Sequence, residues 1–191
     1  MSDLLAGIYG VAIGGVMALG LMLYLRNRHA RCAERRSRPA ALRDADLIHI
    51  EKTFRTTSPV AIAAKLDRAY RLPSGLLVLV ELKTRRNGGP NFSDVIQLSA
   101  QRVALSAATS QTVEAEAFVL IARPGVRRSP IAHRVELLSI DQVVALVRRR
   151  EAILADRISP RYTAEAGNCR GCAFRNQCDG ASRPRRSRAK K

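Results

Sequence analysis

A short apolar run that ends in two opposite charges constrains this chain more than any other stretch. Residues 76–80 read Leu-Leu-Val-Leu-Val and continue directly into Glu81-Leu82-Lys83. Side chains two apart on a strand project to the same face, so we expect Glu81 and Lys83 side by side and Leu82 in the core. Charges buried in an apolar element are costly unless they are paired or hold a metal. The pattern therefore predicts a buried strand with a polar site at its end.

A second carboxylate precedes this strand at the distance of a hairpin. Asp67 lies before the turn at residues 73–75, Pro-Ser-Gly, so the preceding strand would bring it alongside Glu81. Two such carboxylates suit Mg2+ or Mn2+, which prefer hard oxygen ligands and keep several waters. Lys83 would then orient a metal-bound water or help to deprotonate it. Taken alone, these residues also fit a charged surface hairpin.

The helix expected next adds two glutamines to the candidate site. Residues 93–98, Ser-Asp-Val-Ile-Gln-Leu, open this helix, and Gln97 and Gln101 are four residues apart. Residues at this spacing lie on one helical face, where both could meet a phosphate, a base or the edge of the site. An exposed polar stripe is the alternative interpretation.

Together, Asp67, Glu81-x-Lys83 and Gln97 resemble the motifs of the PD-(D/E)XK nucleases, in the RecB-like branch. That branch has an acidic residue, a hairpin-length gap, Glu-x-Lys, and then Gln-x3-Tyr on a helix. The resemblance implies a catalytic set of Asp67, Glu81, Lys83 and Gln97, with Mg2+ or Mn2+ on the two carboxylates. It also implies that the chain hydrolyses DNA phosphodiesters, as an exonuclease.

This chain departs from that branch at two positions. The Tyr position holds Gln101, and the His that RecB-like exonucleases carry on a helix before the Asp has no counterpart. His49 and Glu51 occupy a predicted strand in that region. Glu51 is a candidate third acidic ligand and His49 a candidate ligand or acid, with a partly buried strand histidine as the alternative.

The four cysteines form a second group of candidate ligands. Three fall within ten residues, as Cys169-x2-Cys172-x5-Cys178, and Cys32 lies far upstream. So compact a triplet suits a metal better than disulfides, and four thiolates serve either zinc or an iron–sulfur cluster. Some RecB-like nucleases, including the CRISPR-adaptation exonuclease family, close the nuclease domain with an iron–sulfur cluster held by one early cysteine and a late triplet. The resemblance therefore implies a 4Fe-4S cluster on these four cysteines, with zinc as the alternative.

An uncharged apolar stretch at residues 4–25 predicts one transmembrane helix, since about 20 such residues span a bilayer core. A signal peptide would start with positive charges and end at a small-residue cleavage site, whereas arginines follow this stretch. Those arginines predict that the C-terminal domain lies in the cytoplasm, on the inner membrane. Gly10-x3-Gly14 is a spacing that allows a homodimer, although glycine is common in membrane helices.

The charge balance favours polyanionic partners. The chain has 33 Lys and Arg against 16 Asp and Glu, a formal net charge of +17. Membrane topology and lipid headgroups explain the basic run at 26–38. The basic tail at 181–191 could bind either DNA phosphate or the membrane surface. We expect single- or double-stranded DNA and the membrane as partners. A helicase or an integrase would fit the resemblance.

The whole pattern predicts an α/β chain with a restriction-endonuclease-like core, a mixed sheet flanked by helices, behind one N-terminal transmembrane helix. Its expected parts are the membrane helix at 4–25, a basic juxtamembrane segment at 26–46, the nuclease domain with its cysteines at 47–180, and the basic tail at 181–191. Strands are predicted near 47–55, 60–71, 76–84, 116–122 and 134–138, with helices at about 93–108 and from Ser139.

Two other functions are compatible with the sequence. A membrane-tethered DNA-binding protein could keep the fold without catalysis, since the Tyr and His of the RecB-like pattern are missing. A zinc-ribbon scaffold for a protein partner would use the cysteines alone. Fold by itself does not establish activity, so the site residues must decide between these functions.

Overall fold

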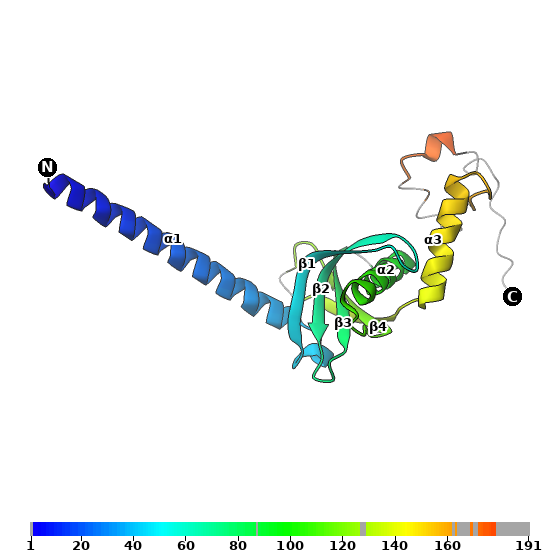
Figure 1. Ribbon diagram of the computed structural model, residues 1–191, viewed down its shortest axis with the longest axis horizontal. Coiled ribbons are helices and arrows are strands. Elements are labelled where there is room, and N and C mark those ends of the chain that lie inside the picture. The colour runs from blue at the N-terminus through cyan, green and yellow to red at the C-terminus, as the bar shows by residue number, and fades with distance from the viewer. Residues whose placement is uncertain are drawn as a thin grey trace. The chain divides into compact units, whose positions relative to one another are not determined.

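A five-stranded mixed β-sheet is the centre of the first of two compact units in this computed structural model (Figure 1). Its strands, in spatial and chain order, are β1 (Asp46–Thr56), β2 (Ile62–Arg71), β3 (Leu77–Thr84), β4 (Glu116–Ala122) and β5 (Ile131–Glu136). All neighbours are antiparallel except β3 and β4, which are parallel. A parallel pair needs a crossover connection, and helix α2 (Phe92–Thr109) supplies it. This mixed sheet with flanking helices fits the expected restriction-endonuclease-like core.

The structure describes residues 2–86, 88–126, 129–161, 163, 169 and 172–178; within helix α1 the side chains of residues 2–14, 16 and 31 lie outside the description. The first unit covers residues 1–145 and the second residues 146–191. The remaining elements are α1 (Ser2–Ser37), η1 (Ala40–Leu42), α3 (Ile140–Leu154) and η2 (Arg175–Gln177).

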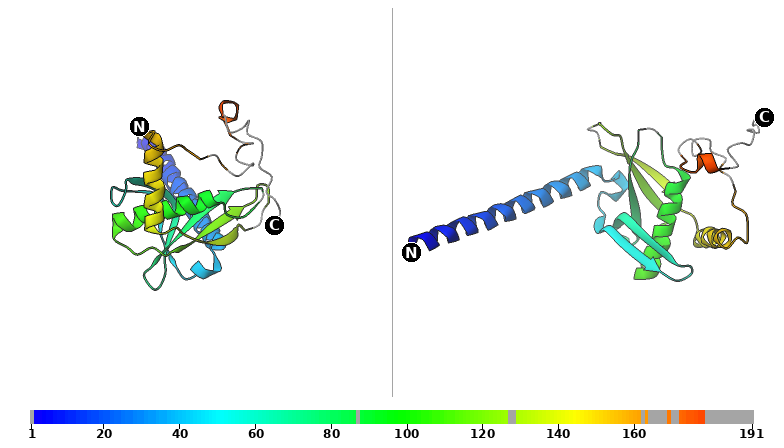
Figure 2. Two further views of the ribbon diagram at one scale, coloured as in Figure 1. Left: turned by 90° about the vertical axis from the view of Figure 1, so that its right-hand side faces the viewer. Right: turned by 90° about the horizontal axis from the view of Figure 1, so that it is seen from above.

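Each face of the sheet has its own apolar core. Leu77 and Leu79 of β3 pack in one cluster with Leu98 and Leu105 of α2. The alternate residues of β3 pack in the other cluster, with Leu42 of η1. Figure 2 shows α2 on one face and the end of α1 with η1 on the other. Because β3 is covered on both faces, its sequence is a continuous apolar run rather than an alternating one.

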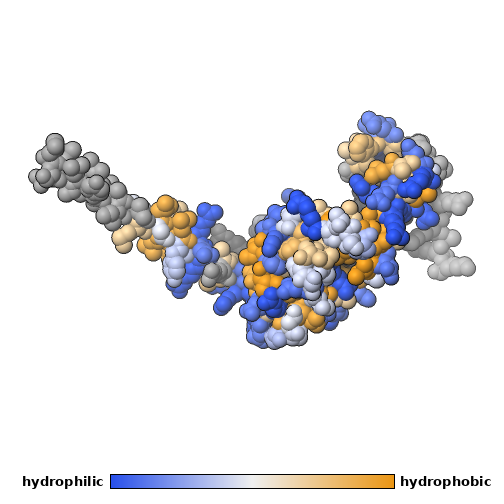
Figure 3. Space-filling model, in the orientation of Figure 1, coloured by the Kyte–Doolittle hydropathy of each residue, from blue (hydrophilic) through white to orange (hydrophobic). Residues whose placement is uncertain are grey.

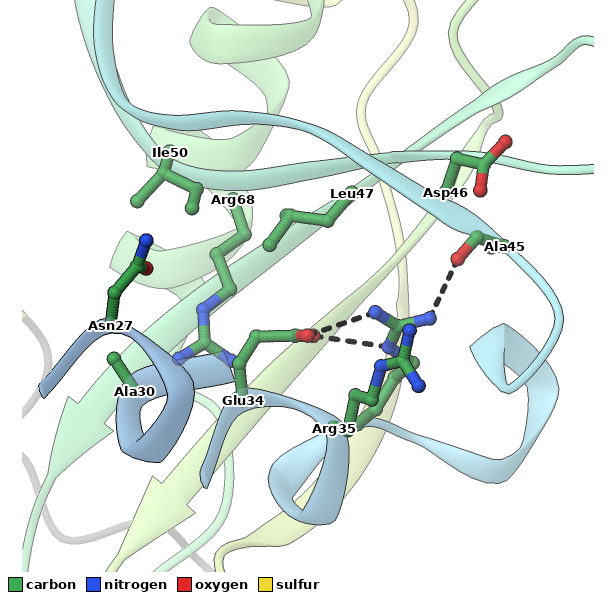
Figure 4. A pocket seen from close by; sticks show the side chains of 10 residues that line it. Asn27, Ala30, Glu34, Arg35, Ala45, Asp46, Leu47, Ile50 and Arg68 are labelled. Atoms are coloured by element: carbon green, nitrogen blue, oxygen red, sulfur yellow. Dashed lines mark hydrogen bonds and ion pairs between the residues drawn. The ribbon is translucent and has the colours of Figure 1, made fainter. Parts of the chain in front are cut away.

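A polar network joins the end of α1 to the second face. The buried Glu34 accepts hydrogen bonds from Arg38 Nε and Nη2, at 3.0 and 2.9 Å, and from the Tyr70 hydroxyl at 2.6 Å. Arg38 also donates to the Ala45 carbonyl oxygen at 2.6 Å. A pocket of about 580 Å3 lies beside this network. Figure 4 shows the side chains that line it, with Arg68 next to Glu34. We call these contacts of Glu34, Arg38 and Tyr70 the α1 latch.

Most predicted elements are confirmed, with small shifts at their ends. The strand predicted at 134–138 is β5, which begins at Ile131 because that residue pairs with Ile121 of β4. The helix predicted from Ser139 is α3, and a capping box begins it: Gln142 N donates to Ser139 Oγ at 3.2 Å, and Ser139 N donates to Gln142 Oε1 at 2.8 Å. Residues 26–37 of the predicted juxtamembrane segment continue α1.

Among the described residues, no helix is long and apolar enough to cross a membrane. The predicted span at 4–25 falls on α1, and the side chains of residues 4–14 and 16 lie outside the described part. The described apolar side chains that follow are exposed, and Figure 3 shows this stretch giving way to hydrophilic residues; they are Met17, Leu19, Leu21, Met22, Leu23, Tyr24 and Leu25.

Candidate active site

The predicted carboxylates Asp67 and Glu81 occupy facing positions where β2 and β3 stop pairing. The register of these strands ends at the pair Arg68 and Val80, and one further step places Asp67 opposite Glu81. Beyond this point Asp67 Oδ2 accepts the backbone N–H of Leu82 at 2.8 Å. A side-chain carboxylate thus replaces a ladder bond at the point where the strands separate.

The neighbouring strand is irregular at the same level. The β1–β2 register pairs Ile50 with Arg68 and Lys52 with Leu66, so Glu51 falls opposite Asp67 without being paired with it. Glu51 has a backbone φ of +48°, which is uncommon for a residue other than glycine. Leu66 and Ala69 pack in one core cluster although they are three residues apart, so the alternation of β2 breaks beside Asp67. Such irregularities re-aim side chains, and they are frequent next to active sites.

Glu81, Lys83 and Gln97 form a closed triangle of polar contacts. Glu81 is only 2% exposed, and its Oε1 lies 2.6 Å from Lys83 Nζ and accepts Gln97 Nε2 at 2.7 Å. Lys83 Nζ in turn donates to Gln97 Oε1 at 2.8 Å. The strand spacing of two therefore does place the two charges together, as expected, and α2 supplies the group that orients both.

Sequence reasoning missed a further ion pair between β3 and α2. Arg85 Nη2 lies 2.5 Å from Asp94 Oδ1, and Asp94 Oδ2 accepts the N–H of Asn91 in the capping box that begins α2. Burial raises the pKa of Asp94, but the bonds from Arg85 and Asn91 outweigh it and leave the pKa below its usual value. The spacing of Arg85 could have revealed this pair, since Arg85 follows Glu81 and Lys83 at intervals of two residues.

Asp67 is a partly buried carboxylate whose negative charge is only partly compensated by its neighbours. Burial raises its pKa most, the charges of Glu81 and Glu51 raise it further, and the Leu82 N–H and Lys83 only partly oppose them. A cation would relieve this repulsion, and carboxylate oxygens are the donors that Mg2+ and Mn2+ prefer. The residues present therefore fit such an ion, held by Asp67 and Glu81.

The additional candidates are placed differently. Within the described part of the chain, no three or more His, Cys, Asp or Glu side chains are grouped closely enough to hold a metal ion. Glu51 is exposed and ion-paired with Lys65. His49 lies edge-on against Phe54 with ring centroids 5.1 Å apart, and burial, with the charges of Lys52 and Arg71, lowers its pKa. These contacts favour the interpretation of His49 as a partly buried strand residue.

Gln101 is the more deeply buried of the two candidate glutamines of α2. It is 2% exposed, and its Nε2 donates to Glu81 Oε2 at 3.0 Å and to the Lys65 carbonyl oxygen at 2.9 Å. The two candidate glutamines thus bind the two different oxygens of Glu81. The alternative of an exposed polar stripe is wrong for Gln101, which lies in the interior.

The four cysteines are not in disulfides, and they belong to different units. Cys32 is an exposed residue of α1, whereas Cys169, Cys172 and Cys178 surround η2 in the second unit. The predicted four-thiolate site would join two units that the structure describes separately. It stays a prediction.

Comparison with known proteins gives one family. The model of the PD-(D/E)XK nuclease superfamily matches residues 15–179. Among solved structures, the chain is similar to the crystal structure of SSO0001, with 18% sequence identity and a TM-score of 0.46, over 87% of this chain and 68% of that one. No curated protein matches the sequence.

Proposed function

We propose that this chain, which belongs to the PD-(D/E)XK nuclease superfamily, is a metal-dependent DNA nuclease of the RecB-like branch, and an exonuclease. The observation that carries the proposal is the meeting of Asp67, Glu81 and Lys83 at one end of β3. Asp67 has a raised pKa there, and Lys83 lies 2.6 Å from Glu81. A surface hairpin would leave these side chains in water, whereas Glu81 is buried.

Each residue has a distinct task in this reaction. When bound by Asp67 and Glu81, Mg2+ or Mn2+ would polarise the phosphodiester and lower the pKa of a bound water. Lys83 Nζ is the ammonium group beside Glu81, 2.6 Å from its Oε1, and it would position that water for attack. Gln97 keeps the ammonium in place through its Oε1, 2.8 Å away. The net charge of +17 supports binding of single- or double-stranded DNA through phosphate contacts.

The test is cleavage of end-labelled single- and double-stranded DNA with Mg2+ or Mn2+, measured beside DNA binding. Asp67→Asn, Glu81→Gln and Lys83→Met should each abolish cleavage and leave binding intact. Glu116→Gln is the matched control, since this carboxylate of β4 pairs with Arg134 on the surface. If the wild type binds DNA but cleaves no substrate with either metal, the protein is a tether and the nuclease assignment is wrong.

Membrane anchoring through residues 4–25 is part of the proposal, with the nuclease domain in the cytoplasm on the inner membrane. Its support is the apolar sequence of that stretch, the exposed apolar side chains of residues 17–25, and the arginines that follow. A reporter fused after Lys191 should be active only in the cytoplasm, and removal of residues 1–25 should release the protein from membranes. An active phosphatase fusion outside the cytoplasm would reverse the orientation. Homodimers, and a helicase or integrase partner, would be found by cross-linking in membranes.

A 4Fe-4S cluster on Cys32, Cys169, Cys172 and Cys178 completes the proposal, and its support is the spacing of the cysteines. Protein purified without oxygen should be brown, absorb at roughly 400 nm and contain about four irons per chain. A colourless protein with one zinc per chain would keep the four ligands and contradict the iron assignment.

A further inference from the structure

Gln101 carries a buried acceptor that has no donor. Its Oε1 is the one buried side-chain nitrogen or oxygen atom, among the described residues, that lacks a hydrogen-bond partner. Leaving a buried polar atom unpaired costs about 1–3 kcal/mol. Such an atom calls for an explanation, and a ligand or ion absent from the structure is one of the few available.

The orientation of this amide is determined by its neighbours. Nε2 donates to the Lys65 carbonyl oxygen and to Glu81 Oε2, and both partners are acceptors only. Turning the amide over would place Oε1 against these two oxygens and would lose both bonds. The unpaired oxygen is therefore a consequence of the contacts and not of an arbitrary assignment.

This unpaired oxygen belongs to the same side chain that orients Glu81. Because Nε2 donates to Glu81 Oε2, the amide group that carries Oε1 lies next to the carboxylate that would hold the cation. Gln97 makes the matching contact with Glu81 Oε1, but its own Oε1 is bonded to Lys83. Both glutamines therefore donate to Glu81, but only Gln101 has an acceptor without a partner.

We propose that Gln101 is a positioning residue for the divalent cation: Nε2 holds Glu81, and Oε1 accepts a hydrogen bond from a water bound to the ion. The inference rests on the proposed function, because it requires a cation at Asp67 and Glu81. Metal-bound waters are strong donors, since the ion polarises them. The acceptor is then unpaired only while the ion is absent, and its pairing adds to the affinity for the ion.

The experiment measures Mn2+ binding to the full-length protein by calorimetry, without DNA. Gln101→Leu should weaken Mn2+ binding by about tenfold or more relative to wild type, the effect of losing a hydrogen bond to a charged group. Gln97→Leu is the matched control, since it also removes one donor from Glu81 but no free acceptor. It should weaken binding less than Gln101→Leu does.

Gln101→Glu provides a second variant that does not depend on the first. It replaces the two donors by acceptors beside Glu81, so the metal-free protein should melt at a lower temperature in EDTA. Mn2+ should then raise its melting temperature by more than it raises that of wild type. Equal Mn2+ affinities of Gln101→Leu and Gln97→Leu, or a smaller Mn2+ effect in Gln101→Glu, would overturn the role of Gln101. Failure of the wild type to bind Mn2+ would instead contradict the metal-dependent nuclease itself.

Discussion

Each face of the sheet has a site with a buried or partly buried carboxylate, and the two carboxylates differ in how many hydrogen bonds the chain gives them. In the α1 latch, Glu34 receives three hydrogen bonds from Arg38 and Tyr70. At the active site, Asp67 receives one backbone N–H and faces two further carboxylates. The latch is complete within the chain, whereas the proposed active site would be completed by a cation.

The pKa values express this difference. Burial raises the pKa of Glu34, but the bonds from Arg38 and Tyr70 outweigh burial, so its pKa lies below the usual 4.5. For Asp67, burial and the like charges of Glu81 and Glu51 act in the same direction, and its pKa lies above the usual 3.8. A lowered folded pKa means that the ionised carboxylate stabilises the fold, whereas a raised one means that ionisation costs stability, as is common at functional sites.

The largest difference between the two carboxylate sites should appear in DNA cleavage. Glu81→Gln should reduce metal-dependent cleavage by at least about a thousandfold, equivalent to about 4 kcal/mol of transition-state stabilisation. Its amide oxygen can still accept from Gln97 or from Gln101, but its NH2 group then faces the other donor, so the unfolding midpoint in urea should also fall. Cleavage is therefore measured at a temperature at which the variant is folded. Glu34→Gln in the latch should retain cleavage. If Glu34→Gln lost cleavage as fully as Glu81→Gln, the two faces would not be functionally distinct.

The second effect concerns stability. Glu34→Leu leaves Arg38 without its carboxylate in a site where that side chain is 11% exposed, and it should lower the free energy of unfolding by about 3–5 kcal/mol. Urea denaturation measures this. Tyr70→Phe, which removes only one donor, should cost about 1 kcal/mol. Equal losses for both variants would show that the latch does not depend on the ion pair.

Asp67→Asn should stabilise the metal-free protein, whereas Glu34→Leu should destabilise it. Asp67→Asn removes a charge that Glu81 and Glu51 repel and keeps an oxygen for the Leu82 N–H, so the metal-free variant should melt at a higher temperature than metal-free wild type. The same change should abolish the stabilisation that Mn2+ gives to wild type. Thermal unfolding with EDTA and with Mn2+ measures both. A loss of stability in EDTA would mean that Asp67 is structural.

The smallest effect is the dependence of these differences on pH. Because the folded pKa of Glu34 is lowered, its stabilisation is present above the unfolded value of 4.5 and is lost as pH falls through the lower folded pKa. Because the pKa of Asp67 is raised, its cost is present above that raised pKa and disappears as pH falls to 3.8. Wild type compared with Glu34→Gln and Asp67→Asn in EDTA, from pH 7 to 3, should show opposite slopes.

Local patterns were sufficient for the elements that carry the active site. The apolar run before Glu81 predicted β3, and residues 93–98 predicted the start of α2, which begins at Phe92. The facing of Asp67 and Glu81 followed from hairpin spacing. The ion pair of Arg85 with Asp94 was missed because the predicted strand ends at residue 84, although the spacing of Arg85 continues that of Lys83.

What the sequence determined by itself is therefore the order of the elements, the pairing of Glu81 with Lys83 and the family. These depend on spacings of two to four residues, which helices and strands convert directly into shared faces. Only the tertiary structure decided the state of each buried group. Glu34 meets Tyr70 across 36 residues, and Gln101 meets Lys65 across 36. Burial and hydrogen bonding depend on such distant contacts, so they alone distinguish the satisfied carboxylate of the latch from the repelled Asp67 and the unpaired oxygen of Gln101.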